Sequence, residues 1–206
     1  LNANERLDCP AGYRIGRRVF KNHGGQDEGM INVKKAIEVS CNTFFYQVMD
    51  KMSLGTWNRW AKEFGFGRKV PLDIGEQATG LIPDSSYFDR VYGRWTKGYL
   101  INLGIGQGDM SATPLQLARY AAALGNGGTL PSPHFAEKMV HPQTGAVRRP
   151  DVPPPEEIPI DSAHFKTVQE GMRRVMTDGT GQWVQIPGIP SAGKTGTAQN
   201  PHGEDH

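Results

Sequence analysis

Residues 191–198 (SAGKTGTA) bring together side chains that suit the binding of a carboxylate. Lys194 supplies an ammonium, and Thr195 and Thr197 supply two hydroxyl donors. If this segment is a strand, its side chains alternate between two faces, so both threonines lie on the same face. Gly196 leaves room for a second backbone to approach. The pattern predicts a strand edge that holds an extended peptide with a free carboxylate.

A second polar group, residues 40–42 (SCN), lies far upstream inside an apolar helical pattern. Asn32 is expected to cap a helix over 33–39, and the apolar spacing of 41–52 predicts another helix. Ser40 therefore falls at the junction between two helices. A serine there can cap the second helix, as Ser-x-Asn triplets usually do. Packing at such a junction would also hold the hydroxyl rigidly, so the capping interpretation and a functional one are compatible.

The remaining segments are interpreted from their hydrophobic period and from the positions of Gly and Pro. Helices are expected over 54–64, over 115–124 behind Thr113 and Pro114, and over 163–176 behind Asp161 or Ser162. The rest is expected to be a loop over 9–29, an irregular segment over 67–98, a strand or hairpin over 133–150, a stiff connector over 149–159 and a strand from 186 to 198.

Composition restricts the classes of partner. The net charge is +2 and the basic pairs are scattered along the chain, so we expect no nucleic acid partner. The six histidines show no zinc-ligand spacing, and no metal or cofactor is called for. No apolar run approaches the length of a membrane span. Cys9 and Cys41 are expected to be independent thiols, although one bridge stays open because sequence does not give its geometry.

Ser-x-Asn followed much later by Lys-Thr-Gly matches two of the three signatures of serine penicillin-binding proteins and β-lactamases. The resemblance covers nearly the whole chain and rests on 36–48 (AIEVSCNTFFYQV), 104–124 (GIGQGDMSATPLQLARYAAAL) and 192–199 (AGKTGTAQ). These segments resemble the transpeptidase domain of class B penicillin-binding proteins, most of all the elongation type, penicillin-binding protein 2. The resemblance implies an α/β fold of the α+β kind, with a helical subdomain and an antiparallel sheet flanked by helices, incomplete in this chain. Because most of the family's sheet would lie outside this piece, helices are expected in excess of strands.

The third signature of the family, a Ser-x-x-Lys nucleophile upstream of Ser-x-Asn, is not found. The one formal match, from Ser191 to Lys194, lies in the predicted strand, which would place these two side chains on opposite faces. The nucleophile motif needs a helix, in which positions i and i+3 share a face. We therefore expect no nucleophile in this chain. Residues 1–206 are interpreted as a partial transpeptidase domain, truncated at both ends and inactive in isolation.

The resemblance implies acyl transfer on the D-Ala-D-Ala end of a peptidoglycan stem peptide, by a serine that β-lactams also acylate. Ser40 would relay a proton toward the leaving nitrogen. Lys194 would orient Ser40 and attract the terminal carboxylate of the substrate. Asn42 would donate its side-chain amide to a backbone carbonyl of the substrate.

The substrate-binding residues that the resemblance implies are Thr195, Gly196 and Thr197. The two threonine hydroxyls would bind the carboxylate, and the N–H of Thr197 would be one oxyanion donor. The implied partners are a stem peptide or lipid-linked precursor, β-lactams, and the membrane glycan polymerase of the elongation machinery. The family is anchored in the inner membrane with a periplasmic catalytic domain. Two alternatives stay open: a β-lactam sensor or β-lactamase of the same fold, and a fragment that is non-catalytic as isolated.

Overall fold

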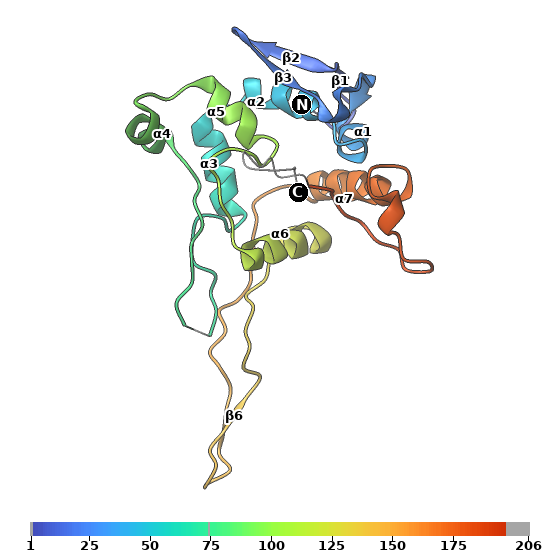
Figure 1. Cartoon of the computed structure of the whole chain (residues 1–206). Helices are drawn as coiled ribbons and strands as arrows, with labels where there is room; N and C mark the ends of the chain where they lie inside the picture. Colours follow the sequence, from blue (N-terminus) through green and yellow to red (C-terminus); the bar gives the residue numbers. More distant parts are fainter. Residues whose placement is uncertain (1, 74, 197–206) are drawn as a thin grey trace.

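The protein has an α+β architecture in which a body of helices carries one long projecting arm (Figure 1). This computed structural model describes residues 2–73 and 75–196. Within them the chain forms seven α-helices and eight short strands, and the strands pair into four two-stranded antiparallel sheets. The helices hold more residues than the strands do, 69 against 24, as the resemblance implies. None of the described helices is long and apolar enough to cross a membrane.

The N-terminal segment forms two small sheets above the helices (Figure 1). Strand β1 (Arg6–Cys9) pairs with β4 (Gly29–Asn32), and β2 (Gly12–Ile15) pairs with β3 (Arg18–Lys21). The expectation of a loop over 9–29 is therefore wrong. Phe20 is buried in the core with Tyr13 and Ile15 packed against the same cluster, while Val19 and the arginines of this stretch face solvent. Each strand has only four residues, too few to show a clear period among so many polar residues.

Two helices follow β4 and meet at Ser40. Helix α1 (Val33–Glu38) begins with Asn32 as its cap, and the Asn32 side chain accepts a hydrogen bond from Lys35 N. Helix α2 (Asn42–Asp50) begins after Cys41, whose sulfur accepts a hydrogen bond from Phe44 N at 3.2 Å. The predicted junction at Ser40 is confirmed. The residue that caps the second helix is Cys41, however, and Ser40 is left free for another role.

Cys9 and Cys41 form a disulfide that joins the end of β1 to the start of α2. Their Cα atoms lie 6.4 Å apart, and both side chains are almost fully buried. The expectation of two independent thiols is therefore wrong. The pairing of β1 with β4 brings Cys9 to the helix junction, and this long-range contact has no signal in the local sequence.

The first core cluster lies between α2 and three further helices. These are α3 (Leu54–Glu63), α4 (Ser85–Tyr92) and α5 (Lys97–Leu103). Helix α4 lies inside the segment that the sequence predicts to be irregular, so that expectation is wrong in part. Asp84 caps α4 and a left-handed Gly93 ends it, which makes it an eight-residue helix among loop residues. Its Phe88 is buried and stacks on Tyr99, with ring centroids 4.6 Å apart.

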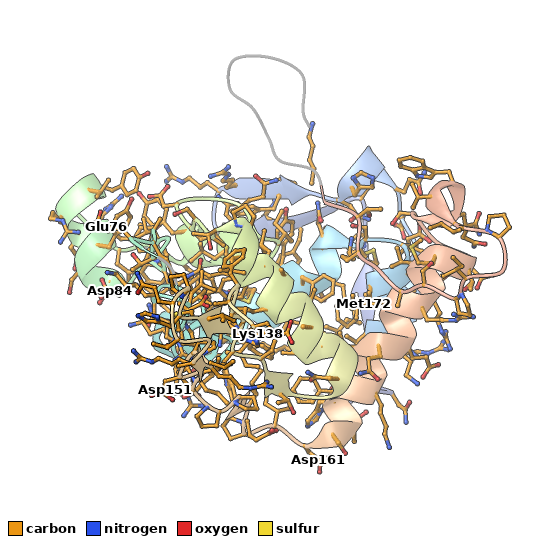
Figure 2. The ribbon with its side chains drawn as sticks, turned by 90° about the horizontal axis from the view of Figure 1, so that it is seen from below. Glu76, Asp84, Lys138, Asp151, Asp161 and Met172 are labelled. Carbon is orange, nitrogen blue, oxygen red and sulfur yellow. A yellow bond between two sulfur atoms is a disulfide. The ribbon has the colours of Figure 1, made fainter. Side chains whose placement is uncertain are left out.

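The second half of the chain builds the arm and the longest helix. Helix α6 (Pro114–Asn126) begins with a capping box formed by Thr113 and Gln116, as the Thr-Pro signal predicts. The arm contains β5 (Thr129–Leu130), β6 (Met139–Val140), β7 (Val147–Arg148) and β8 (Glu156–Glu157), with β6 and β7 near its far end (Figure 1). Helix α7 (Ser162–Thr177) starts behind its cap, Asp161, which is labelled in Figure 2. The predicted hairpin and both predicted helices are confirmed.

The segment that carries Lys194 returns along α7. The N–H of Gly193 donates to the carbonyl oxygen of Met172 at 3.1 Å, and Figure 2 labels Met172 on α7. The predicted strand is wrong for the described part, because residues 191–196 pair with no strand among the described residues. A strand is defined by its ladder with a neighbour. Only an isolated bridge between Ile186 and Ile189 forms upstream of Lys194.

Candidate functional site

The side chains of Ser40 and Lys194 meet although 154 residues separate them in the sequence. The Nζ atom of Lys194 donates a hydrogen bond to Ser40 Oγ at 2.7 Å. The same ammonium donates to the carbonyl oxygen of Thr195 at 2.9 Å. An ammonium carries donors only, so these two bonds fix its position and make Ser40 Oγ an acceptor. This is the convergence that the two sequence motifs predict.

The backbone of Ser40 is left-handed, with φ of 59°, and Ser40 is the one non-glycine residue with positive φ in the described part of the chain. The N–H of Ser40 donates to Ile37 O at 3.3 Å, and the N–H of Cys41 donates to Ala36 O at 2.9 Å. This pair of bonds is a Schellman motif that ends α1, with Ser40 where glycine is usual. A left-handed serine costs about 1–2 kcal/mol relative to the right-handed form. Such strain is typical of functional positions that the surrounding structure holds firmly.

Asn42 is the first residue of α2, two positions after Ser40. Its backbone N–H donates to the side-chain oxygen of Asn22 at 2.8 Å. The side-chain amide of Asn42 makes no hydrogen bond to any other described residue. In particular, it makes none to Lys194. The structure therefore places Asn42 beside Ser40 through the turn between the helices, with an amide available to a ligand.

Thr195 is held by a second hydroxyl. Its Oγ1 lies 2.8 Å from Oγ1 of Thr180, at hydrogen-bonding distance. The backbone N–H of Thr180 donates in turn to the carbonyl oxygen of Glu38 at 3.3 Å, two residues before Ser40. Thr180 therefore links the segment that carries Ser40 to the segment that carries Lys194.

Gly196 and Thr197 complete the predicted binding set. A Cβ atom built on Gly196 would meet nothing within 4 Å among the described residues, so the space predicted for a second backbone is open on that side. Thr197 lies outside the described residues, and its predicted hydroxyl and N–H contacts stay predictions.

The charge of Lys194 is not neutralised by any carboxylate of the described chain within ion-pair distance. Part of its side chain is exposed, yet the surrounding protein displaces enough water from the ammonium to lower the pKa of Lys194 below its usual value. An unpaired, partly desolvated cation beside hydroxyl groups attracts an anionic ligand. No group of three His, Cys, Asp or Glu side chains in the described residues is arranged to hold a metal ion.

Sequence reasoning missed four residues that shape this site. Thr180 lies in the Gly-Thr-Gly segment after α7, whose glycines indicate only the end of a helix. The pairing of Cys9 with Cys41 was considered but not favoured. Asn22, which binds the N–H of Asn42, carries no local signal at all, because its partner lies 20 residues away.

Comparison with known proteins decides the family. All of the chain, residues 1–206, matches the family described as the penicillin binding protein transpeptidase domain. The chain belongs to this family. Its members' helical and antiparallel architecture is the one described above, so the fold expected for the transpeptidase domain is confirmed.

Several relatives of this transpeptidase domain carry the names MrdA or penicillin-binding protein 2. The peptidoglycan D,D-transpeptidase MrdA of Acinetobacter baumannii is 34% identical over 183 residues, which are 87% of this chain and 27% of that protein. The penicillin-binding protein 2 of Pseudomonas aeruginosa, solved in complex with WCK 5153, is 32% identical with a TM-score of 0.86, over 100% of this chain and 47% of that one. The chain spans between 25% and 30% of the length of the curated relatives it matches.

A third relative is a chain from a structure that describes the coordination of polymerization and crosslinking by a peptidoglycan synthase complex. It is 32% identical to this chain with a TM-score of 0.83, over 98% of this chain and 34% of that one. These likenesses identify the chain as a transpeptidase domain similar to penicillin-binding protein 2.

Proposed function

We propose that this chain is part of a peptidoglycan D,D-transpeptidase that cross-links stem peptides by acyl transfer from D-Ala-D-Ala and is acylated by β-lactams. The observation that carries this proposal is the 2.7 Å hydrogen bond from Lys194 Nζ to Ser40 Oγ. Nothing local in the sequence brings these residues together, and the reaction needs them together. The names of the curated relatives support the same activity.

The direction of the Ser40 bond suggests how a proton moves. Because Lys194 can only donate, Ser40 Oγ accepts from it and its own hydroxyl proton points elsewhere. In the proposed reaction, a serine outside these 206 residues gives its hydroxyl proton to a neighbouring base and attacks the penultimate carbonyl carbon. The C–N bond to the terminal D-Ala then breaks. Ser40 gives its proton to the leaving nitrogen and takes one from Lys194, so the D-Ala leaves with a neutral amine. An amine of a neighbouring stem peptide then accepts the acyl group.

The carboxylate of the substrate would bind at Lys194 and Thr195, with Thr197 as the third contact. The unpaired ammonium supplies the charge, and a hydroxyl adds a directional donor. The unbonded amide of Asn42 would donate to a backbone carbonyl of the substrate. The open side of Gly196 would let the peptide backbone lie close. The oxyanion would be held by the N–H of Thr197 and by the N–H of the nucleophile.

The proposed substrates are a stem peptide or a lipid-linked precursor, at the periplasmic side of the inner membrane. The proposed protein partner is a membrane glycan polymerase of the elongation machinery. The similarity to a chain of a peptidoglycan synthase complex supports such a partner.

Three incubations test the proposal. The complete protein, in which we expect a Ser-x-x-Lys helix beside these residues, should form a stoichiometric, slowly hydrolysed adduct with a labelled penicillin. Given a D-Ala-D-Ala donor peptide and an amine acceptor, it should release D-Ala and form the cross-linked product. The 206 residues alone should form no adduct, because they hold no nucleophile.

Three results would contradict the proposal in different ways. Rapid turnover of the penicillin would indicate a β-lactamase, and a stable adduct without cross-linking would indicate a β-lactam sensor. A mass increase on the 206-residue chain itself would show that one of its own serines is the nucleophile, and Ser191 would be the first to examine.

A further inference from the structure

The turn between α1 and α2 is held in place by contacts from the N-terminal segment. Two contacts do this, and we call them the turn clamp: the Cys9–Cys41 disulfide and the side-chain amide of Asn22. The disulfide holds the residue after Ser40, and Asn22 holds the backbone of the residue after that. Both contacts come from the region of β1 to β4, which carries none of the motif residues.

The side chain of Asn22 is buried, with 7% of its surface exposed, and all of its hydrogen-bonding groups are used. Its oxygen accepts from Asn42 N at 2.8 Å and from His23 N at 2.9 Å. Its nitrogen donates to Gln26 O at 2.8 Å and lies 3.3 Å from the sulfur of Cys9. A buried amide in this state has one orientation only. Asn22 therefore fixes where α2 begins relative to the N-terminal sheets.

The disulfide half of the clamp is supported by Thr43. The Thr43 hydroxyl donates to the carbonyl oxygen of Pro10 at 2.9 Å and lies 3.3 Å from the sulfur of Cys41. Thr43 is fully buried, so these contacts are shielded from water. The start of α2 is thus tied to β1 by a covalent bond and by hydrogen bonds to the residues around it.

The clamp explains how a strained serine keeps its place. A left-handed serine relaxes to a commoner conformation unless its neighbours prevent it. Relaxation at Ser40 would turn its hydroxyl away from Lys194, because φ sets the direction of the side chain relative to both helices. The residues that prevent this on the α2 side are Cys41 and Asn42, and each is held by the clamp.

We propose that Asn22 is a positioning residue for acylation, which acts with the Cys9–Cys41 disulfide to hold the Ser40 hydroxyl against Lys194. This inference rests on the proposed transpeptidase function. Asn22 forms no hydrogen bond with Lys194 and binds Asn42 only at its backbone N–H, so it acts through the turn.

A double-mutant cycle in the complete protein tests the proposal. The measurement is the second-order rate constant of acylation by a labelled penicillin, for Asn22→Ala with Ser40 present and for Asn22→Ala combined with Ser40→Ala. Because small displacements of a reacting group cost large factors in rate, Asn22→Ala should slow acylation about tenfold when Ser40 is present. It should change the rate by less than about twofold when Ser40 is already alanine, because the two residues act through one contact.

Three further variants separate positioning from folding. Asn22→Ser keeps a cap for the turn at His23 but is too short to reach Asn42, so it should slow acylation as Asn22→Ala does. Asn58→Ala is the matched control, because Asn58 also donates from a half-buried amide to backbone carbonyls, but to those of Ile82 and Pro83 and not to the turn. Asn58→Ala should leave the acylation rate unchanged. Replacing both cysteines by serine should reproduce the Asn22 effect, again only when Ser40 is present.

Each outcome bears on a different claim. Equal slowing by Asn22→Ala with and without Ser40 would overturn the positioning role, since a general loss of structure acts in both backgrounds. An unchanged rate in Asn22→Ser would also overturn it, as would a Ser40→Ala protein that is acylated at the normal rate. A complete wild-type protein that penicillin does not acylate would instead refute the proposed function, and the inference would fall with it.

Discussion

Gly179 packs against the backbone of Glu38 so closely that a Cβ atom at Gly179 would overlap the Glu38 carbonyl oxygen and lie 2.9 Å from Val175 Cα. Both obstacles are backbone atoms, so neither can swing aside. The next residue, Thr180, donates its N–H to the same Glu38 carbonyl and its hydroxyl contacts Thr195. The absent side chain of Gly179 therefore lets the end of α7 approach the turn that carries Ser40.

We predict that Gly179→Ala destabilises the protein by about 1–3 kcal/mol, the usual cost of forcing extra atoms into a packed interior. It should also slow acylation, because the Thr180 link between the two motif segments must lengthen. Gly125→Ala is the control. Gly125 lies in α6 with nothing within 4 Å of its added Cβ, so alanine should stabilise by about 0.5–1 kcal/mol through helix propensity. Urea denaturation measures both, and equal effects of the two variants would contradict the packing argument.

Because Cys9 and Cys41 are paired, we predict how many cysteines can be alkylated and how much stability the protein loses without the bond. Alkylation of the denatured protein should modify no cysteine without a reductant and both cysteines after reduction. The bond closes a loop with a sequence separation of 32, so chain entropy predicts that its loss lowers the free energy of unfolding by roughly 3–4 kcal/mol. Serine at both positions is the suitable variant, because a serine at 41 still caps α2. Alkylation of both thiols in the unreduced protein would refute the pairing.

Tyr92 offers a titration test away from the site. Its hydroxyl donates to Asp109 Oδ1 at 3.0 Å, and this hydrogen bond, followed by desolvation and the charge of Asp109, raises the pKa of Tyr92 from the usual 10 to about 12. The folded state then binds the proton more tightly than the unfolded state does. This contribution to stability is complete below pH 10 and is lost as pH rises toward 12. NMR of ring-labelled tyrosine, assigned with Tyr92→Phe, should show the shift, and Asp109→Asn should move it back toward 10. An unchanged value in Asp109→Asn would contradict the cause.

The lowered pKa of Lys194 leads to a prediction about how acylation depends on pH. Desolvation lowers the pKa of Lys194 below its usual 10.5, and the proposed role needs the charged form. Acylation should therefore fall as pH rises through this lowered pKa, on a limb centred below pH 10.5. The free energy of unfolding changes in the opposite direction. Between the lowered pKa and 10.5 the unfolded state binds more protons than the folded state, so stability rises with pH. Lys194→Arg keeps a charge at all these pH values, so the limb should disappear. A limb that persists in Lys194→Arg belongs to another group.

The sequence predicts those elements whose signals are local. Asn32, Thr113 with Pro114, and Asp161 each mark a helix start that the structure confirms. In these cases the capping side chain and the backbone it binds lie within three residues of each other. The period of apolar residues then extends over enough turns to be recognised.

What the sequence fails to predict depends on distant partners. The sheet of β1 and β4 joins residues 20 to 26 positions apart, and the disulfide follows from that pairing. Helix α4 is too short for its period to stand out between Asp84 and Gly93. The strand expected at Lys194 has no ladder partner in the described chain.

The residues of the candidate site also differ in how far the sequence predicts their contacts. The meeting of Ser40 with Lys194 was expected from two motifs and a family resemblance, since no local rule relates residues so far apart. The roles of Asn42, Thr195 and Gly196 stay predictions, as does that of Thr197, which lies outside the described residues. Asn22 could not be anticipated, because its only sign is the structure of the turn it holds.

The central claim is that the Ser40–Lys194 contact is the proton-transfer centre of an acyl-transfer site. The most direct test is the second-order rate of penicillin acylation of the complete protein for Ser40→Ala, Lys194→Ala and the double variant, with Lys166→Ala, an exposed lysine of α7, as control. Each single change should slow acylation about 10²–10⁴-fold, and the double variant should be little slower than the worse single one, because the two side chains act as one unit. The control should keep the normal rate. Normal acylation of Lys194→Ala would contradict the account.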